Sequence, residues 1–74
     1  MTNKLHIETA MAFKDKIKAF DKGAQWLYTF EAKASLDRIE ASLDRLYNNH
    51  CLSEKDFKRF DDMILNRRDK YVFA

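Results

Sequence analysis

The stretch from Ala34 to Tyr47 reads ASLDRIE and then ASLDRLY, a seven-residue unit followed by a copy with two changes. Its large aliphatic side chains recur at steps of three and four residues, at Leu36, Ile39, Leu43 and Leu46. This spacing places all four along one face of an α-helix, at heptad a and d positions. Two heptads favour a helix inside an intramolecular bundle. The alternative is self-association of two chains through the same four side chains, as a coiled-coil dimer.

A second apolar face runs along the same segment, almost opposite the first. Its members are Leu27, Phe30, Ala34 and Ala41. A helix that is apolar on two sides is expected to lie between packing partners. We therefore predict a helix over about residues 24–48 with a neighbour on each side.

The segment after this helix carries the signals of a loop and then of a new helix. Residues 48–51 read Asn-Asn-His-Cys, and asparagine suits a loop because it tolerates left-handed backbone. Ser53 is a good N-cap, and Asp56 three residues later makes an acidic variant of the capping box. Apolar residues then recur at helical spacing, at Phe57, Phe60, Ile64 and Tyr71. This pattern predicts a helix over residues 53–71.

The N-terminal part of the chain carries one apolar stripe. Its members step by four and three residues and are His6, Ala10, Phe13, Ile17, Phe20 and Ala24. Thr2 or Asn3 is expected to cap the start of this helix. Gly23 is the only glycine and stands where a left-handed residue would end the helix. The stripe therefore predicts a helix over about residues 3–22.

The composition agrees with an all-α protein. The 74 residues contain no proline and one glycine, whereas hairpins need residues that adopt positive φ in tight turns. The length allows one domain, so we predict that residues 1–74 form a small three-helix bundle. A single cysteine cannot form an internal disulfide, and neither a secretory signal nor a membrane-spanning apolar run is recognisable. We expect a cytoplasmic protein without a membrane partner.

Motifs of catalysis are not recognisable. The sequence lacks a glycine-rich phosphate loop, a nucleophile elbow and a zinc-type set of cysteines and histidines. His50 and Cys51 are neighbours, but adjacent side chains point apart, and a nucleophile needs its base within hydrogen-bond reach. We expect no enzyme activity, no catalytic residue, no metal site and no cofactor. The outer faces of the helices are then the parts of the molecule that carry its function.

A basic face is the first candidate surface. Lys14, Lys18 and Lys22 follow one another at steps of four residues, opposite the apolar stripe of their helix. Ile7 and Met11 share that side, where a plain solvated face has little reason for them. Lysines around an apolar pair suit an acidic partner with a hydrophobic anchor, or a nucleic-acid backbone.

An acidic edge on the helix over residues 24–48 is the second candidate surface. It consists of Asp37, Glu40 and Asp44. Glu40 and Asp44 are like charges one turn apart, which is unfavourable in an isolated helix. We therefore expect this edge to meet basic groups of a partner.

The helix over residues 53–71 offers an alternative, nucleic-acid-binding surface. As a recognition helix it would place Asn66 and an arginine against base edges in a major groove. The residues of this surface are Arg59, Asn66, Arg67 and Lys70. Three nearby aspartates, Asp61, Asp62 and Asp69, would repel phosphates, which makes direct DNA reading the weaker alternative.

Several short motifs follow one another between about residues 26 and 68. They are Trp26-Leu27 with Phe30, then Ser35-Leu36-Asp37-x-Ile39-Glu40, then Leu52-Ser53 with Asp56-Phe57 and Phe60, and finally Asn66-Arg67. This order resembles the Hha/YmoA family of small helical modulators, which bind the nucleoid protein H-NS and act on transcription through it. The resemblance implies that Asp37 and Glu40 belong to an acidic surface that meets basic residues of such a protein. Where the family has Asp-His-Arg, this sequence has Leu65-Asn66-Arg67.

The sequence thus predicts a non-enzymatic protein-interaction module that modulates a nucleic-acid-associated protein complex, with contact to nucleic acid secondary. One alternative is a small inhibitor, encoded by a mobile element or phage, that binds and blocks a host enzyme or defence complex. The other is a direct DNA-binding protein, dimeric through the heptad residues.

Overall fold

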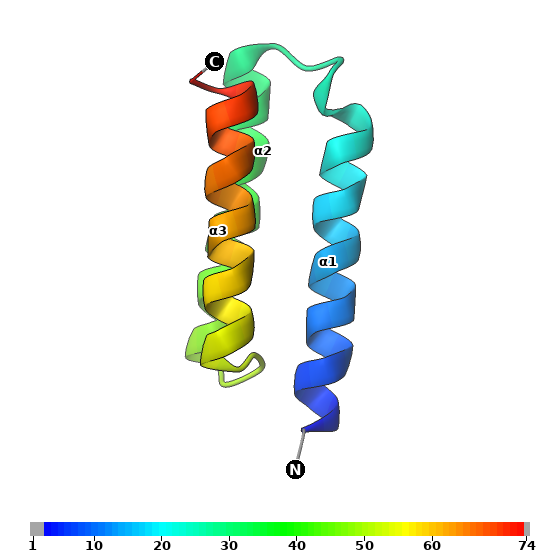
Figure 1. Ribbon diagram of the computed structural model, residues 1–74, viewed down its shortest axis with the longest axis vertical. Coiled ribbons are helices and arrows are strands. Elements are labelled where there is room, and N and C mark those ends of the chain that lie inside the picture. The colour runs from blue at the N-terminus through cyan, green and yellow to red at the C-terminus, as the bar shows by residue number, and fades with distance from the viewer. Residues whose placement is uncertain (1–2, 74) are drawn as a thin grey trace.

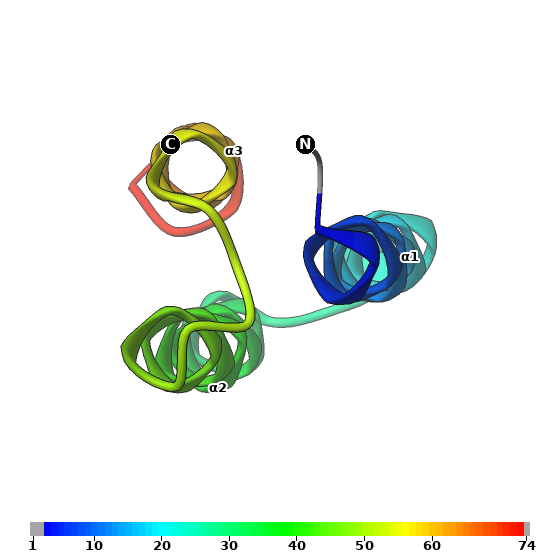
Figure 2. The same cartoon turned by 90° about the horizontal axis from the view of Figure 1, so that it is seen from below.

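Three α-helices form the computed structural model, which describes residues 3–73 (Figure 1). Their bounds are Lys4–Ala24 for α1, Thr29–Asn48 for α2 and Glu54–Tyr71 for α3. Seen along their length the helices lie at the corners of a triangle, and each runs antiparallel to the next (Figure 2). The molecule is an elongated three-helix bundle of 42 × 18 × 15 Å, which confirms the predicted all-α fold.

The core lies where the three helices face one another. Its buried residues are Phe13, Ile17, Phe20 and Ala24 of α1, Ala32, Leu36, Ile39 and Leu43 of α2, Leu52 of the second loop, and Phe60 and Ile64 of α3. Three of the four heptad residues are among them, and Leu46 packs against the core. The prediction of an intramolecular bundle is therefore confirmed. Because these side chains are used inside the chain, they do not form an open seam for a dimer.

The prediction that α2 has a neighbour on each side is wrong for its second apolar face. Phe30 is 72% exposed, and Ala34 and Ala41 are exposed as well. In a triangle of helices both neighbours approach each helix from the inner side, so its opposite face is left to solvent (Figure 2). Leu27 alone of this set packs against the core, and it does so from the loop before α2.

The junction between α1 and α2 differs from the sequence prediction. α1 ends at Ala24 rather than Lys22, and Gly23 lies inside the helix without a positive φ. The helix continues because Ala24, the last member of the predicted stripe, is buried against the core. α2 begins at Thr29 rather than at residue 24, because Tyr28 is extended and its N–H donates to Glu31 Oε1 at 2.9 Å.

The helix starts follow their predicted caps more closely. Asn3 Oδ1 accepts a hydrogen bond from the Leu5 N–H at 2.9 Å, and Ser53 Oγ accepts one from the Asp56 N–H at 3.1 Å. The alternative cap, Thr2, lies outside the described residues. In the second loop the left-handed residue is His50, with φ 61°, rather than one of the asparagines.

Candidate interaction surfaces

The acidic edge of α2 is paired within the chain. The guanidinium of Arg68, whose side chain is only 13% exposed, lies 2.9 Å from Asp37 Oδ1 and 2.5 Å from Glu40 Oε2. Lys33 Nζ lies 2.9 Å from the other oxygen of Asp37. A basic partner would therefore have to compete with Arg68 for both carboxylates. Asp44 is exposed and has no ion pair within residues 3–73.

This pairing favours the charged forms of Asp37 and Arg68. The hydrogen bonds from Lys33 and Arg68 hold the pKa of Asp37 below its ordinary value. Burial disfavours the charged form of Arg68, but its hydrogen bonds to Glu40 and Asp37 outweigh burial and raise its pKa. Arg68 and Asp37 therefore stay ionised throughout the neutral range, and α3 is tied to α2 by a charged contact.

Arg67 ties α3 to α1 in the same way. Its guanidinium donates to both carboxylate oxygens of Asp21, at 3.1 and 2.8 Å, and to the Met63 carbonyl at 3.2 Å. A bidentate pair of this kind fixes orientation as well as charge. Within residues 3–73, every ion pair that joins two helices involves Arg67 or its neighbour Arg68.

The recognition-helix alternative is weakened by this arrangement. Arg67 faces α1, so it would have to leave Asp21 before it contacted a base or a phosphate. Arg59 pairs with Asp56 at 3.3 Å within its own helix. Lys70 lies 5.1 Å from the centre of the Tyr71 ring, and Asn66 is exposed. The predicted residues share α3, but they do not present a set of free cations around Asn66.

The basic face of α1 has the arrangement that its spacing predicts. Lys14, Lys18 and Lys22 are exposed, and no ion pair in the described part of the chain involves them. Ile7 and Met11, on the same side, are 45% and 64% exposed. α1 therefore presents cations around two apolar side chains, away from the core.

A cluster of exposed aromatic side chains lies at the turn between α1 and α2. Trp26, Tyr28 and Phe30 are 80%, 73% and 72% exposed, and we call these three residues the aromatic turn. The Tyr28 and Phe30 rings are stacked, with centres 6.0 Å apart and planes 5° apart. The backbone beneath them is fixed, because the Trp26 N–H donates to the Gly23 carbonyl at 3.0 Å and Tyr28 caps α2 through Glu31.

Sequence reasoning missed the aromatic turn. It assigned Phe30 to a packing face of α2 and placed Trp26 in the same helix. The signal that was available is the alternation of positions 26, 28 and 30, which fits no single face of a helix. Three aromatics at that spacing cannot all enter a helical core, so at least part of the set had to remain outside it.

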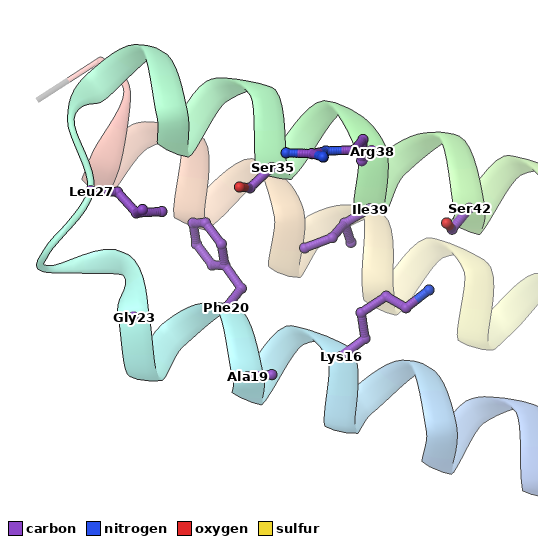
Figure 3. Close-up of a pocket in the computed structure, with 9 residues that line it drawn as sticks. All are labelled: Lys16, Ala19, Phe20, Gly23, Leu27, Ser35, Arg38, Ile39 and Ser42. Carbon is purple, nitrogen blue, oxygen red and sulfur yellow. The ribbon is translucent and has the colours of Figure 1, made fainter.

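A groove with a volume of about 580 Å³ runs between α1 and α2 beside the aromatic turn (Figure 3). Phe20, Leu27 and Ile39 form its apolar floor, and Lys16 and Arg38 stand on its two sides (Figure 3). A second hollow of about 380 Å³ continues along α1 toward its N-terminus, between Leu5 and Leu46, and also touches Lys16. Both hollows are lined by residues of α1 and α2, and Lys16 lies between them.

His6 meets the second loop, which holds His50 and Cys51. Within residues 3–73, no three His, Cys, Asp or Glu side chains gather as metal ligands would. Cys51 Sγ donates to the Asn49 carbonyl at 3.7 Å, and His6 Nε2 lies 3.0 Å from the His50 carbonyl oxygen. None of the helices in this part of the chain has the length and apolarity needed to cross a membrane.

Comparison with known proteins adds no relative to this picture. The chain matches no family model, no curated protein and no solved structure. The resemblance to the Hha/YmoA family therefore stays a prediction from the motifs alone.

Proposed function

We propose that this chain is a protein-interaction module and that the aromatic turn is the centre of its binding surface. The exposure of Trp26, Tyr28 and Phe30 carries the proposal. Burying a side chain of this size is worth roughly 1.5–3 kcal/mol, and a domain of this length has only a few kcal/mol of stability. Three such residues in water contribute little to the isolated fold, and they are accounted for by a partner that covers them.

Their geometry suits a protein partner. Tryptophan and tyrosine are enriched among the residues that dominate binding energy at protein interfaces. The stacking of the Tyr28 and Phe30 rings and the capped start of α2 restrict these two side chains, so less of their conformational entropy is lost on binding. Base stacking would also use aromatics, but it needs cations along the phosphates. Arg67 and Arg68, near the C-terminus of α3, are paired with carboxylates, whereas Lys22 of α1 is exposed and forms no ion pair within residues 3–73. A protein partner is therefore favoured by the aromatic side chains themselves rather than by a lack of cations.

The finer proposal keeps the function predicted from the sequence, a modulator of a nucleic-acid-associated protein complex. The basic face of α1 supports it, because its lysines are free for a second contact. A basic partner at the acidic edge would have to displace Arg68 from Asp37 and Glu40, so this edge gives the proposal weaker support than the basic face does. An inhibitor of a host enzyme would use the same aromatic turn, and the identity of the partner distinguishes the two functions.

Photocrosslinking in the native host tests the proposal. A benzoylphenylalanine replaces Phe30 in one variant and the exposed Asp62 of α3 in a matched control. We expect a covalent adduct with a defined protein from position 30 alone, and we expect a Trp26→Ala, Tyr28→Ala background to remove it. Circular dichroism checks that each variant keeps its helices. Equal adducts from both positions, or adducts with nucleic acid or lipid in place of protein, would refute the proposal.

A further inference from the structure

The groove between α1 and α2 has the length of a helix-binding site. Its α1 side runs from Leu5 to Gly23, which is about 27 Å at 1.5 Å per residue. The floor formed by Phe20, Leu27 and Ile39 is apolar, so water in the groove is easily displaced. A helix of about 18 residues would lie along both hollows with one apolar stripe inward.

The sides of the groove permit close approach. Ala12, Ala19 and Gly23 stand on the α1 side, and Ser35 and Ser42 stand two turns apart on α2. Small residues at such spacings let another helix come near the two backbones. The sides of the groove therefore carry few bulky side chains, which leaves room for a helix of a partner to pack against α1 and α2.

Gly23 gives independent support, because nothing within residues 3–73 requires a glycine there. It lies inside α1 without a positive φ, and a Cβ added to it would meet no atom of the described residues within 4 Å beyond its chain neighbours and its own helix backbone. A glycine inside a helix costs roughly 0.5–1 kcal/mol relative to alanine. A partner backbone that packs directly on this position accounts for the missing side chain.

The charges of the groove decide what the partner must carry. Lys16 on α1 and Arg38 on α2 flank the floor. Within residues 3–73 neither of these two cations forms an ion pair. Glu8, which lines the second hollow, lies 3.9 Å from Lys4 Nζ. Asp37 and Glu40 of α2 are paired with Arg68 on the side of α3. Cations on both sides of an apolar floor complement acidic residues on both sides of an apolar stripe.

We propose that this groove binds an acidic amphipathic helix of a partner protein. The proposal rests on the proposed function only in that the chain binds proteins, because the groove and the aromatic turn are different surfaces. A nucleic acid would meet the cations but leave the apolar floor uncovered. A basic amphipathic helix would cover the floor but face Lys16 and Arg38 with like charge.

A displayed library of helical peptides of about 18 residues, screened against the full chain, tests the proposal. We expect enrichment of peptides with an apolar stripe flanked by Asp or Glu. The best peptide should bind the Gly23→Leu variant roughly tenfold or more weakly, because a leucine side chain at this position takes up space in the groove that Gly23 lines. Reversal of charge in the double variant Lys16→Glu, Arg38→Glu should shift preference to a version of the peptide with Lys in place of Glu.

A matched variant separates this surface from the aromatic turn. Trp26→Ala leaves the lining of the groove intact, so its affinity for the selected peptide should stay within roughly twofold of wild type. Circular dichroism confirms that the variants are folded. The proposal is overturned by no enrichment, by enriched peptides without the acidic pattern, or by Trp26→Ala weakening binding as much as Gly23→Leu does. The peptide-binding results do not depend on crosslinking at Phe30, so the proposal for the groove and the proposal for the aromatic turn can be refuted independently.

Discussion

The substitution Gly23→Ala should stabilise the isolated chain. Gly23 is helical and lies one residue before the end of α1, and apart from its chain neighbours and the backbone of its own helix no atom of the described residues lies within 4 Å of the position that a Cβ would take. Alanine therefore adds no clash, raises helix propensity and restricts the unfolded chain. The combined effect is about 0.5–1 kcal/mol in the free energy of unfolding. For a domain of this size it corresponds to a rise of roughly 2–8 °C in Tm.

Urea denaturation followed by circular dichroism at 222 nm measures this change. The midpoint should rise while the slope with denaturant stays the same, because the surface exposed on unfolding does not change. Ala19→Gly is the matched control: Ala19 is exposed, lies in the same helix and lines the same groove. It should lower the free energy of unfolding by about the same 0.5–1 kcal/mol.

A neutral or destabilising effect of Gly23→Ala would refute the reasoning. Such a result would mean that the position adopts a backbone conformation that alanine does not tolerate, or that neighbouring atoms come closer than they do in this structure. If alanine stabilises the fold and leucine blocks the peptide at the same position, the glycine is explained by binding rather than by folding. The lower stability that glycine gives the isolated chain would then be explained by the need to keep the groove open for a partner.

Three further outcomes follow from the packing and the charges. Phe60→Ala should destabilise the fold by roughly 3–5 kcal/mol and leave the chain largely unfolded, as measured by circular dichroism, because the ring is fully buried against Phe13 with centres 4.8 Å apart. A double-mutant cycle of Asp21→Asn and Arg67→Gln should give a coupling of about 1 kcal/mol from urea denaturation, and zero coupling would mean that the pair does not hold α1. The folded pKa of Asp37 is below 3.8, so its contribution is present above pH 3.8 and is lost as the pH falls through the folded pKa. The difference in stability between wild type and Asp37→Asn should therefore shrink as urea denaturation is repeated at lower pH, and a difference that grows would contradict the pairing.

The packing faces of the helices were predictable from the sequence, and their ends were less so. Buried residues recur every three to four positions along α2 and α3, so the spacing of Leu36, Leu43 and Phe60 in the sequence is enough to predict that they lie in the core. The end of α1 was predicted at Lys22 because of Gly23, although the apolar stripe already ran on to Ala24, which is buried in the core. A lone glycine after a lysine is a common helix stop, but tertiary packing overrode that preference here.

The candidate surfaces also divide into those that local spacing predicts and those that depend on how the helices pack together. The basic face of α1 was predictable, because exposure follows from the position of the core stripe. The occupation of Asp37 and Glu40 by Arg68 was not, because the partners are 31 and 28 residues apart (68 − 37 and 68 − 40) and meet only once α2 and α3 are placed together. The groove belongs to two helices at once, so no stretch of sequence describes it alone.

The two adjacent arginines of α3 also select the hand of the bundle. Neighbouring side chains on a helix point about 100° apart, so Arg67 and Arg68 reach α1 and α2 only when those helices follow one another in one sense around α3. A bundle of opposite hand would bury much the same apolar stripes, but α1 and α2 would exchange places around α3. Arg67 would then lose Asp21, and the nearly buried guanidinium of Arg68 would lose both its carboxylates. The order of two charges thus decides between topologies that apolar burial alone leaves close in energy.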